Sequence, residues 1–541
     1  MGRAATYNLA DLFESVVDAV GERVAVVAGG RRLTYTELDG RANRLAHHLE
    51  ANGVGSGDHV GLHLRNGTEY LEAMLAAFKL RAVPVNINYR YVARELEHLY
   101  ASMSLIALVV HRGFAADAAA AARQVSGLDH VVVVDDGSDV EAPEGWRAYE
   151  EVLASASSGR GFASRSPNDH YIACTGGTTG LPKGVVWRHE DIFFAALGGG
   201  DATRMVGPIA SPGELVERIS EQPLVIVVTP PLMHVSAHWT ALGALLGGGR
   251  VVLTGGGSFD PAGCWELVVA EGANVIVVVG NAMAGPLVDH YVEHPVDASR
   301  LFAIGSGGAV LSPAVKRRIG AALPNVLVLD GFGSTETGVA GTAAGVADAG
   351  AGGAAFGVDD TTAVLDDDLR PVPRGSQVVG RLARRGRIPL GYYGDPEKTA
   401  ANFVEVDGTR WSLPGDMATV DADGRVHLLG RGSASINTGG EKVFPEEVES
   451  AVMALDGVAD VLVVGVPDDR WGERVVAVVQ WRPGGEVALE ALQAQVRRDL
   501  AGYKVPRQVV AVEAVHRAPN AKPDYAWARA QAVAAGPPAD P

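Results

Sequence analysis

The most informative stretch of the chain is Thr175-Gly176-Gly177-Thr178-Thr179-Gly180-Leu181-Pro182-Lys183-Gly184. Its glycines allow the backbone to approach an anion closely and to adopt positive φ angles. The threonine hydroxyls and the Lys183 ammonium add hydrogen-bond donors and positive charge, which suit a polyphosphate. A Walker A loop is excluded, because Lys183 follows Leu-Pro and Val185 stands where that motif has Ser or Thr. We therefore predict a phosphate-binding loop of another kind, rather than a flexible Gly/Thr hinge.

Short apolar segments rich in β-branched residues recur on both sides of this loop, as buried strands do. Amphipathic patterns between many of them predict helices. The expected strands and two clear helices are Val24–Ala28, Val131–Val134, Leu224–Val228, Val275–Val279 and Val326–Leu329, with helices Tyr35–Ala51 and Glu69–Leu80. This alternation predicts an α/β fold with a large N-terminal body of mixed and parallel sheets flanked by helices. The polar, Ser/Gly-rich stretch Asp135–Asp169 is interpreted as a surface excursion.

The composition changes near Gly430. We divide the chain there into a subdivided N-terminal body, residues 1–430, and a small mobile α+β C-terminal domain, residues 431–541. The patterns expected in the second part are a helix at Pro445–Leu455, strands at Val461–Val466 and Val475–Gln480, and a helix at Leu489–Leu500. The tail Ala534–Pro541, rich in proline, is expected to be disordered.

Charge and cysteine usage exclude several classes of protein. The chain has 46 Lys and Arg against 64 Asp and Glu, a net charge of −18, which argues against coating nucleic acid or an anionic membrane. Two cysteines, Cys174 and Cys264, cannot build a disulfide scaffold or a Cys-based zinc site. No secretory signal is visible, so a cytoplasmic location is expected. The uncharged stretch Leu224–Gly249 contains Pro and Gly breaks and predicts a buried strand, turn and helix, with no integral membrane segment.

The stretch at residues 175–184 resembles the phosphate loop of adenylate-forming enzymes, which include acyl-CoA synthetases, luciferases and the adenylation domains of peptide synthetases. Further motifs of that family follow in the family's order over most of the chain. They are Gly331-Phe332-Gly333-Ser334-Thr335-Glu336-Thr337-Gly338, Gly391-Tyr392-Tyr393-Gly394-Asp395-Pro396-Glu397-Lys398-Thr399, Trp411-Ser412-Leu413-Pro414-Gly415-Asp416, Thr438–Glu449 and Arg517–Tyr525. By this resemblance the chain is identified as a member of the family.

The resemblance implies how ATP is bound. Thr335 contacts the α-phosphate and Glu336 holds Mg²⁺, since a carboxylate that meets phosphates needs a cation between them. The remaining phosphate contacts implied are Thr175, Gly176, Gly177, Thr178, Thr179, Gly180 and Lys183. The nucleoside contacts implied are Gly308 and Ala309 along the adenine, Asp330 at its amino group, and Asp416 and Arg431 at the ribose.

The C-terminal motifs imply two half-reactions at one pocket. Lys522 balances charge while the acyl-adenylate forms. The small domain then rotates and brings in the segment Gly439, Gly440, Glu441 and Lys442, along which the pantetheine arm of coenzyme A passes.

Two residues depart from the family pattern. Ala521 replaces a glycine before the lysine, and Ser433 replaces the hinge Asp or Lys, so the rate is in doubt but the reaction class is not.

The acid is expected beside His234, which occupies the aromatic position next to the reacting carboxylate; the alternative is a packed polar core residue. The other acid contacts implied are Val235, Trp239, Gly307, Phe332 and Gly333. A zinc site at His234 and His238 is disfavoured because no Glu lies between them, and no Gly-x-Ser-x-Gly motif exists for a hydrolase.

Three stretches, at residues 183–191, 430–433 and 502–507, resemble actinobacterial ligases that act on fatty acids and steroid side chains. The prediction is an acid–thiol ligase, an AMP-forming acyl-CoA synthetase, that uses ATP, Mg²⁺ and coenzyme A. Its substrate would be a medium- or long-chain fatty acid or a steroid side-chain acid, with an aryl acid as the alternative. An amine or carrier protein as acceptor, and nucleotide binding without catalysis, are the rival functions. A homodimer and no nucleic-acid partner are expected.

Overall fold

The computed structural model describes residues 6–175, 182–204, 206–309, 311–345, 355–376, 378–438, 441–468, 472–517 and 522–536. Several predicted site residues lie outside these ranges, namely Gly176, Gly177, Thr178, Thr179, Gly180, Gly439 and Gly440, as does Ala521. Within the described ranges, no helix has the length and apolar character needed to cross a bilayer. The uncharged stretch Leu224–Gly249 forms the strand β10 (Val225–Val228) and the helix α9 (Val235–Leu246), as predicted.

Two eight-stranded sheets dominate the described part of the chain. Sheet I has the order β19-β9-β8-β4-β3-β5-β6-β7, and sheet II has the order β15-β14-β13-β12-β10-β11-β1-β2. The interior strands of both sheets are parallel, and antiparallel pairs occur at their edges. Sheet I comprises β3 His59–His63, β4 Val83–Asn86, β5 Leu105–His111, β6 His130–Val134, β7 Arg147–Ala148, β8 His170–Thr175, β9 Lys183–Arg188 and β19 Gly391–Tyr392. Sheet II comprises β10 with β1 Val24–Ala28, β2 Arg31–Thr34, β11 Arg250–Leu253, β12 Val275–Val278, β13 Ala303–Gly307, β14 Leu327–Ser334 and β15 Gly338–Ala344.

Helices fill the space between the two sheets and cover their outer faces. The shared core joins both sheets with α9, α1 (Leu9–Val20), α2 (Tyr35–Ala51) and α3 (Thr68–Lys79). Separate cores place α4 (Ala93–Ser102) and α5 (Ala115–Ala122) against sheet I. They also place α10 (Pro261–Glu271), α11 (Gly280–Glu293) and α12 (Pro313–Ala322) against sheet II. The predicted α/β body of mixed and parallel sheets flanked by helices is therefore confirmed.

Local sequence explains where several elements begin and end. The predicted helix Tyr35–Ala51 is observed with those bounds, because Thr34 and Glu37 form a capping box at its start. In contrast, β14 runs past the predicted end at Leu329 to Ser334, since the motif residues continue the pairing with β13 and β15. The motif thus begins on a strand and ends in the turn to β15, at the edge of sheet II.

The interpretation of Asp135–Asp169 as a surface excursion is wrong in part. This stretch contains β7 and the helix α6 (Tyr149–Ser155), whose Tyr149 and Leu153 are buried. Arg165 is also buried and pairs with Asp11 at 2.7 Å and with Glu14. Its polar composition was misleading because a buried charge can be stabilised by a partner from a distant part of the chain.

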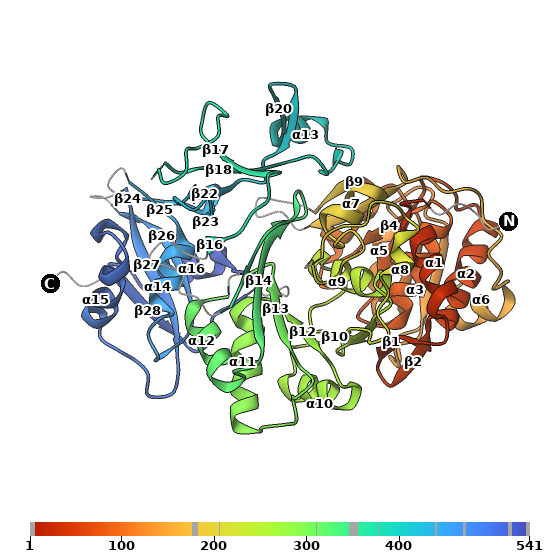
Figure 1. Cartoon of the computed structure of the whole chain (residues 1–541), viewed down its shortest axis with the longest axis horizontal. Coiled ribbons are helices and arrows are strands. Elements are labelled where there is room, and N and C mark those ends of the chain that lie inside the picture. Colours follow the sequence, from red (N-terminus) through yellow and green to blue (C-terminus); the bar gives the residue numbers. More distant parts are fainter. Residues whose placement is uncertain are drawn as a thin grey trace.

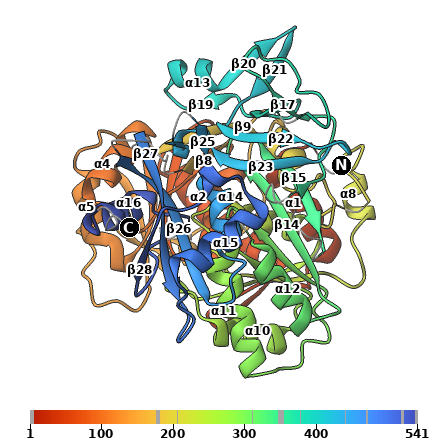
Figure 2. The ribbon, with the colours of Figure 1, turned by 90° about the vertical axis from the view of Figure 1, so that its left-hand side faces the viewer.

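The rest of the chain forms two smaller sheets (Figure 1). Sheet III contains β16 Ala355–Phe356, β17 Thr362–Leu365, β18 Gly380–Arg385, β20 Phe403–Val406, β21 Thr409–Ser412, β22 Asp416–Val420 and β23 Val426–Arg431. Sheet IV contains β24 Ile436–Thr438, β25 Glu441–Val443, β26 Val458–Asp468, β27 Gly472–Trp481 and β28 Gln508–Val512. The helices after β19 are α13 Pro396–Asn402, α14 Pro445–Val452, α15 Leu489–Asp499 and α16 Tyr525–Ala534. Figure 2, turned by 90°, places sheet IV with α14 and α15 in front of sheet II.

The chain passes from sheet III to sheet IV in a few residues. Sheet III ends with β23 at Arg431, a 3₁₀ turn covers Gly432–Ala434, and sheet IV begins at Ile436. The small α+β domain seen here agrees with the predicted fold class, while the exact division at 430/431 stays a prediction. The helix α16 extends the ordered part of the C-terminus to Ala534, and residues 537–541 lie outside the described chain.

Candidate active site

Two strands of sheet I flank the predicted phosphate loop. Thr175 ends β8 and Lys183 begins β9, and these two residues are paired across the antiparallel strands. Thr175 and Lys183 are therefore the phosphate-binding residues predicted in the loop that lie within the described ranges. The Lys183 side chain is mostly buried, and its ammonium lies 3.6 Å from Oε1 of Glu336, in the turn after β14. The loop of sheet I and the motif of sheet II thus meet through their two charged residues.

Tyr392, on β19, joins Lys183 and Glu336 into one cluster. Its hydroxyl donates a hydrogen bond of 2.9 Å to Oε1 of Glu336. The Lys183 ammonium lies 4.1 Å from the centre of the Tyr392 ring, a cation–π distance. One carboxylate oxygen therefore faces both an ammonium group and a phenol, so the orientation of the Glu336 carboxylate is fixed before any ligand binds.

The backbone that carries Thr335 and Glu336 is held from two other strands. The indole Nε1 of Trp187, on β9, donates to the carbonyl of Thr335 at 3.0 Å. The hydroxyl of Ser412, on β21, donates to the carbonyl of Glu336 at 2.7 Å. Trp187 and Ser412 are fully buried, so water does not compete for these bonds. The turn is therefore fixed to sheets I and III as well as to sheet II.

His234 lies at the start of α9, and its Nε2 atom is buried with no hydrogen-bond partner among the described residues. Burial, together with the positive charge of Lys522 and the nearby His238, lowers the pKa of His234 to about 3. The imidazole is therefore neutral at neutral pH. Because the charge of Lys522 acts on His234, the predicted catalytic lysine and the predicted acid-binding histidine lie on the same side of the molecule.

Glycines border an open space beside the end of β13. A side chain at Gly308 would meet no heavy atom within 4 Å, and one at Gly307 would first meet the carbonyl of Gly331 at 3.5 Å. At Gly305 the nearest atom would be a methyl of Val277, at 3.9 Å. Val235 is half-buried at the start of α9. The three glycines therefore leave room for at least one further carbon atom beside the end of β13.

Two predicted acid-binding side chains take part in core packing. The Phe332 ring lies 4.7 Å from the Phe356 ring in the core of sheet III. Trp239 is buried, and its Nε1 donates to the hydroxyl of Tyr171 at 3.1 Å. Gly333 has a structural role of its own, because a side chain there would collide with the carbonyl of Gly338 in the turn between β14 and β15. Contact of these three residues with the acid stays a prediction.

The predicted nucleoside-binding residues lie along sheets II and III. Asp330, on β14, is buried and pairs with the Lys316 ammonium on α12 at 2.8 Å. Burial raises the pKa of Asp330, while Lys316 opposes that rise. The backbones of Asp416 and Arg431 are directly opposed in the pairing of β22 with β23, and their contact with the ribose stays a prediction. Ala309, predicted beside the adenine, follows Gly308 directly after β13. Glu441 and Lys442, predicted beside coenzyme A, lie on β25 of sheet IV.

The family relationship follows from comparison with known sequences. A family model described as AMP-binding enzyme matches residues 13–393, and one described as AMP-binding enzyme C-terminal domain matches residues 447–522. The chain belongs to the AMP-binding enzyme family. The identification made from the phosphate loop and its companion motifs is therefore confirmed.

Relatives of this AMP-binding enzyme include CoA ligases. It is 46% identical to the 3-oxocholest-4-en-26-oate–CoA ligase of Rhodococcus rhodochrous, over 97% of this chain and 96% of the relative. It is 42% identical to a medium/long-chain-fatty-acid–CoA/3-oxocholest-4-en-26-oate–CoA ligase of Mycolicibacterium smegmatis, over 96% of each chain. A crystal structure of the anthranilate CoA ligase AuaEII in complex with anthranoyl-AMP has the same fold, with a TM-score of 0.85, 22% identity and 99% of each chain covered. The predicted resemblance to actinobacterial ligases is confirmed.

Sequence reasoning missed four residues that shape the site of this AMP-binding enzyme, namely Tyr392, Trp187, Ser412 and Lys316. The first three lie inside stretches that match the family or its actinobacterial members, so a signal was present. Their contacts with Glu336, Thr335 and Asp330 join positions far apart in the sequence, and only the fold brings them together.

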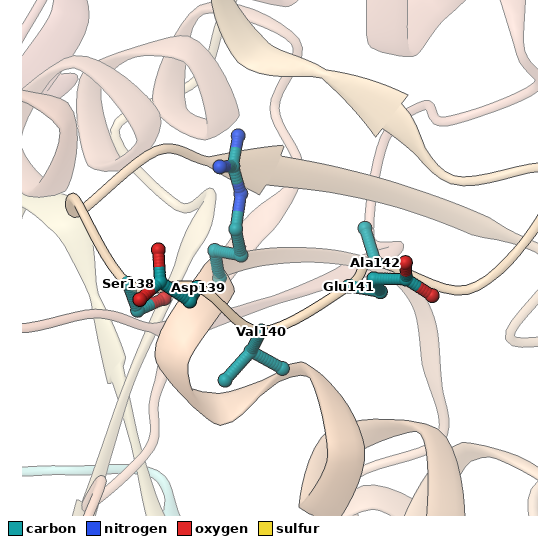
Figure 3. Close-up of a pocket in the computed structure, with 6 residues that line it drawn as sticks. Ser138, Asp139, Val140, Glu141 and Ala142 are labelled. Carbon is teal, nitrogen blue, oxygen red and sulfur yellow. The ribbon is translucent and has the colours of Figure 1, made fainter.

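A separate hollow of the AMP-binding enzyme lies elsewhere. It has a volume of about 430 Å³ and is lined by Arg112 and residues 138–142. Figure 3 shows that the labelled residues, Ser138 to Ala142, follow one another along a single loop. This loop is mostly exposed, and none of its residues belongs to the motifs that meet at Glu336. The hollow is therefore not the active site.

Proposed function

We propose that this AMP-binding enzyme is an ATP-dependent acyl-CoA ligase that acts on hydrophobic carboxylic acids. The observation that carries the proposal is the cluster of Lys183, Glu336 and Tyr392, placed where the predicted phosphate loop meets the motif of β14. The names of relatives that cover nearly the whole chain support the same reaction.

In the first half-reaction, a carboxylate oxygen of the acid attacks the α-phosphorus of ATP. A carbon–oxygen–phosphorus linkage forms, and the bond from the α-phosphorus to the bridging oxygen breaks to release pyrophosphate. Lys183 stabilises the phosphate charge, and Lys522 reduces the repulsion between the two anions. The neutral imidazole of His234, with its unpartnered Nε2, orients the carboxylate by a hydrogen bond.

Glu336 fits a magnesium ion that arrives with ATP. Its carboxylate offers hard oxygen ligands, and Mg²⁺ commonly takes one or two protein carboxylates together with phosphates and water. The described residues contain no group of three or more His, Cys, Asp or Glu side chains that could hold a metal alone. The ion, when bound, would neutralise phosphate charge.

In the second half-reaction, the sulfur of coenzyme A attacks the carbonyl carbon of the acyl-adenylate and AMP leaves. We propose that the C-terminal domain rotates between the two steps, so that Lys522 withdraws and Gly439–Lys442 reaches the site. The short connection from β23 to β24 supports this, because few residues join sheet III to sheet IV. We also propose that the reaction takes place in the cytoplasm, and we expect a homodimer.

The acid we propose is a steroid side-chain acid or a medium- to long-chain fatty acid, as in the names of the relatives. Gly305, Gly307 and Gly308 support a bulky hydrophobic substrate, because no side chain at these positions takes up room beside β13. An aryl acid is the alternative.

A panel of acids tests the proposal. The enzyme is incubated with ATP, Mg²⁺, coenzyme A and either 3-oxocholest-4-en-26-oate, palmitate, decanoate or benzoate, and the products are read by mass spectrometry and pyrophosphate release. Acyl-CoA from the steroid or fatty acids is expected. Acyl-adenylate without acyl-CoA would instead favour an amine or carrier protein as acceptor. Absence of pyrophosphate release with every acid would overturn the proposal in favour of nucleotide binding alone.

A further inference from the structure

Asn86, at the end of β4, uses its whole carboxamide to join two parts of the active site. Its Oδ1 accepts a hydrogen bond of 2.7 Å from the backbone N–H of Cys174. Its Nδ2 donates to the carbonyl of Cys174 at 2.9 Å and to the carbonyl of Met233 at 2.7 Å. Cys174 directly precedes Thr175, and Met233 directly precedes His234. Asn86 is buried, so these bonds are shielded from water.

A second asparagine holds the same segment without reaching β8. The Oδ1 of Asn66 accepts from the N–H of Leu232 at 2.7 Å, and its Nδ2 donates to the carbonyls of Pro230 and Thr254, each at 3.3 Å. The segment that leads to His234 is therefore held twice from sheet I. Only Asn86 of the two also binds the strand that enters the phosphate loop.

We infer that Asn86 is a positioning residue for acyl-adenylate formation, an inference that rests on the proposed function. It fixes the distance between the start of the phosphate loop, which holds ATP, and His234, which holds the acid. The attacking oxygen and the α-phosphorus then meet in line without a search over backbone conformations. The asparagine side chain suits this position because its single carboxamide group can donate two hydrogen bonds and accept one.

Asn86→Asp tests the role, because aspartate has the same shape and can accept from Cys174 but cannot donate to either carbonyl when ionised. We expect kcat of adenylate formation, measured by pyrophosphate release, to fall on the order of 100-fold, since a misplacement of about 1 Å has that effect. Thioester formation from supplied acyl-adenylate should fall less than about threefold, because it no longer needs ATP and acid to meet.

Asn66→Asp is the matched control, since it disturbs the same segment without touching β8. It should raise KM for the acid and leave KM for ATP unchanged. Asn86→Asp could instead lose both half-reactions equally, in proportion to the fraction folded by circular dichroism. That result would show that Asn86 has only a structural role and would overturn the inference. If Asn86→Asp does not fold, Asn86→Ser is measured with the same expectation. The wild-type rate tests the proposed function, and the ratio of variant to wild type tests Asn86, so the two failures are distinguishable.

Discussion

The Tyr392 hydroxyl donates a hydrogen bond of 2.9 Å to Oε1 of Glu336, across two sheets and 56 residues of sequence. The same oxygen is the one nearest the Lys183 ammonium. Glu336 thus faces the phosphate loop with one oxygen already engaged, and its other oxygen is left to face a ligand. Because hydrogen bonds to a charged group are strong, Tyr392 fixes the direction of the carboxylate that we propose as the ligand of Mg²⁺.

Tyr392→Phe removes the hydroxyl and keeps the ring beside Lys183. A hydrogen bond to a charged group contributes about 1.5–3 kcal/mol, so we expect at least about a tenfold loss in kcat/KM for Mg·ATP. Initial rates of pyrophosphate release at varied Mg·ATP measure this. The neighbouring Tyr393→Phe is the control, because Tyr393 is 36% exposed and contacts the His59 ring rather than Glu336. Equal kinetics in the two variants would show that the hydroxyl does not orient Glu336.

Lys522→Ala should separate the two half-reactions. The ammonium is needed while two anions meet, and loss of one such stabilising charge lowers the rate about 10²–10³-fold. Formation of acyl-CoA from supplied acyl-adenylate should stay close to the wild-type rate, because in the proposed rotation Lys522 has left the site by then. Arg529→Ala removes an exposed cation from α16 of the same domain and serves as the control. A parallel loss of both half-reactions would contradict the rotation of the C-terminal domain.

Much of the fold was predictable because its signals are local. The Thr34–Glu37 capping box sets the start of α2, and Gly272, with φ of 60°, ends α10. Site residues in motifs, such as Lys183 and Glu336, were predictable because their spacing carries the chemistry. Contacts between motifs were not predictable, since no sequence spacing connects Ser412 with Glu336 or Asn86 with Met233. The position of Phe332 in its motif was clear from the sequence. The motif did not show, however, that its ring packs into the core of sheet III.

Ser412→Ala should weaken the turn that carries Glu336. The variant leaves the buried carbonyl of Glu336 without its donor, and an unsatisfied buried acceptor destabilises by about 1–3 kcal/mol. Urea unfolding measures the loss of stability, and KM for Mg·ATP should rise with it. Ser15→Ala, on α1, is a suitable control, because that hydroxyl bonds the carbonyl of Asp11, outside the site. Unchanged stability in Ser412→Ala would mean that water replaces the lost donor.

A carboxyl group behind the Lys522 segment predicts a pH dependence of local stability. Burial, together with the neighbouring Glu446 and Asp460, raises the pKa of Glu449, on α14, to about 8. Arg517 opposes this effect, as does the hydrogen bond that Glu449 accepts from the N–H of Val463 at 2.9 Å. Tyr525, directly after Asp524, approaches the same carboxyl at 3.5 Å. The group therefore lies between the two ends of the segment that carries Lys522.

Because the folded pKa of Glu449 exceeds the unfolded value, its contribution to stability is complete below about pH 4 and declines as pH rises towards 8. In that window the folded state holds one more proton, so the free energy of local unfolding falls by up to about 1.4 kcal/mol per pH unit. Glu449→Gln cannot ionise and should remove this slope. The measurement is hydrogen–deuterium exchange of the β26 amides in the wild type and in Glu449→Gln at each pH. Comparing the two proteins at the same pH cancels the intrinsic exchange rate and isolates the effect of Glu449. Glu490→Gln, on the exposed start of α15, should keep the wild-type slope. A slope that survives in Glu449→Gln would assign the proton to a group other than Glu449.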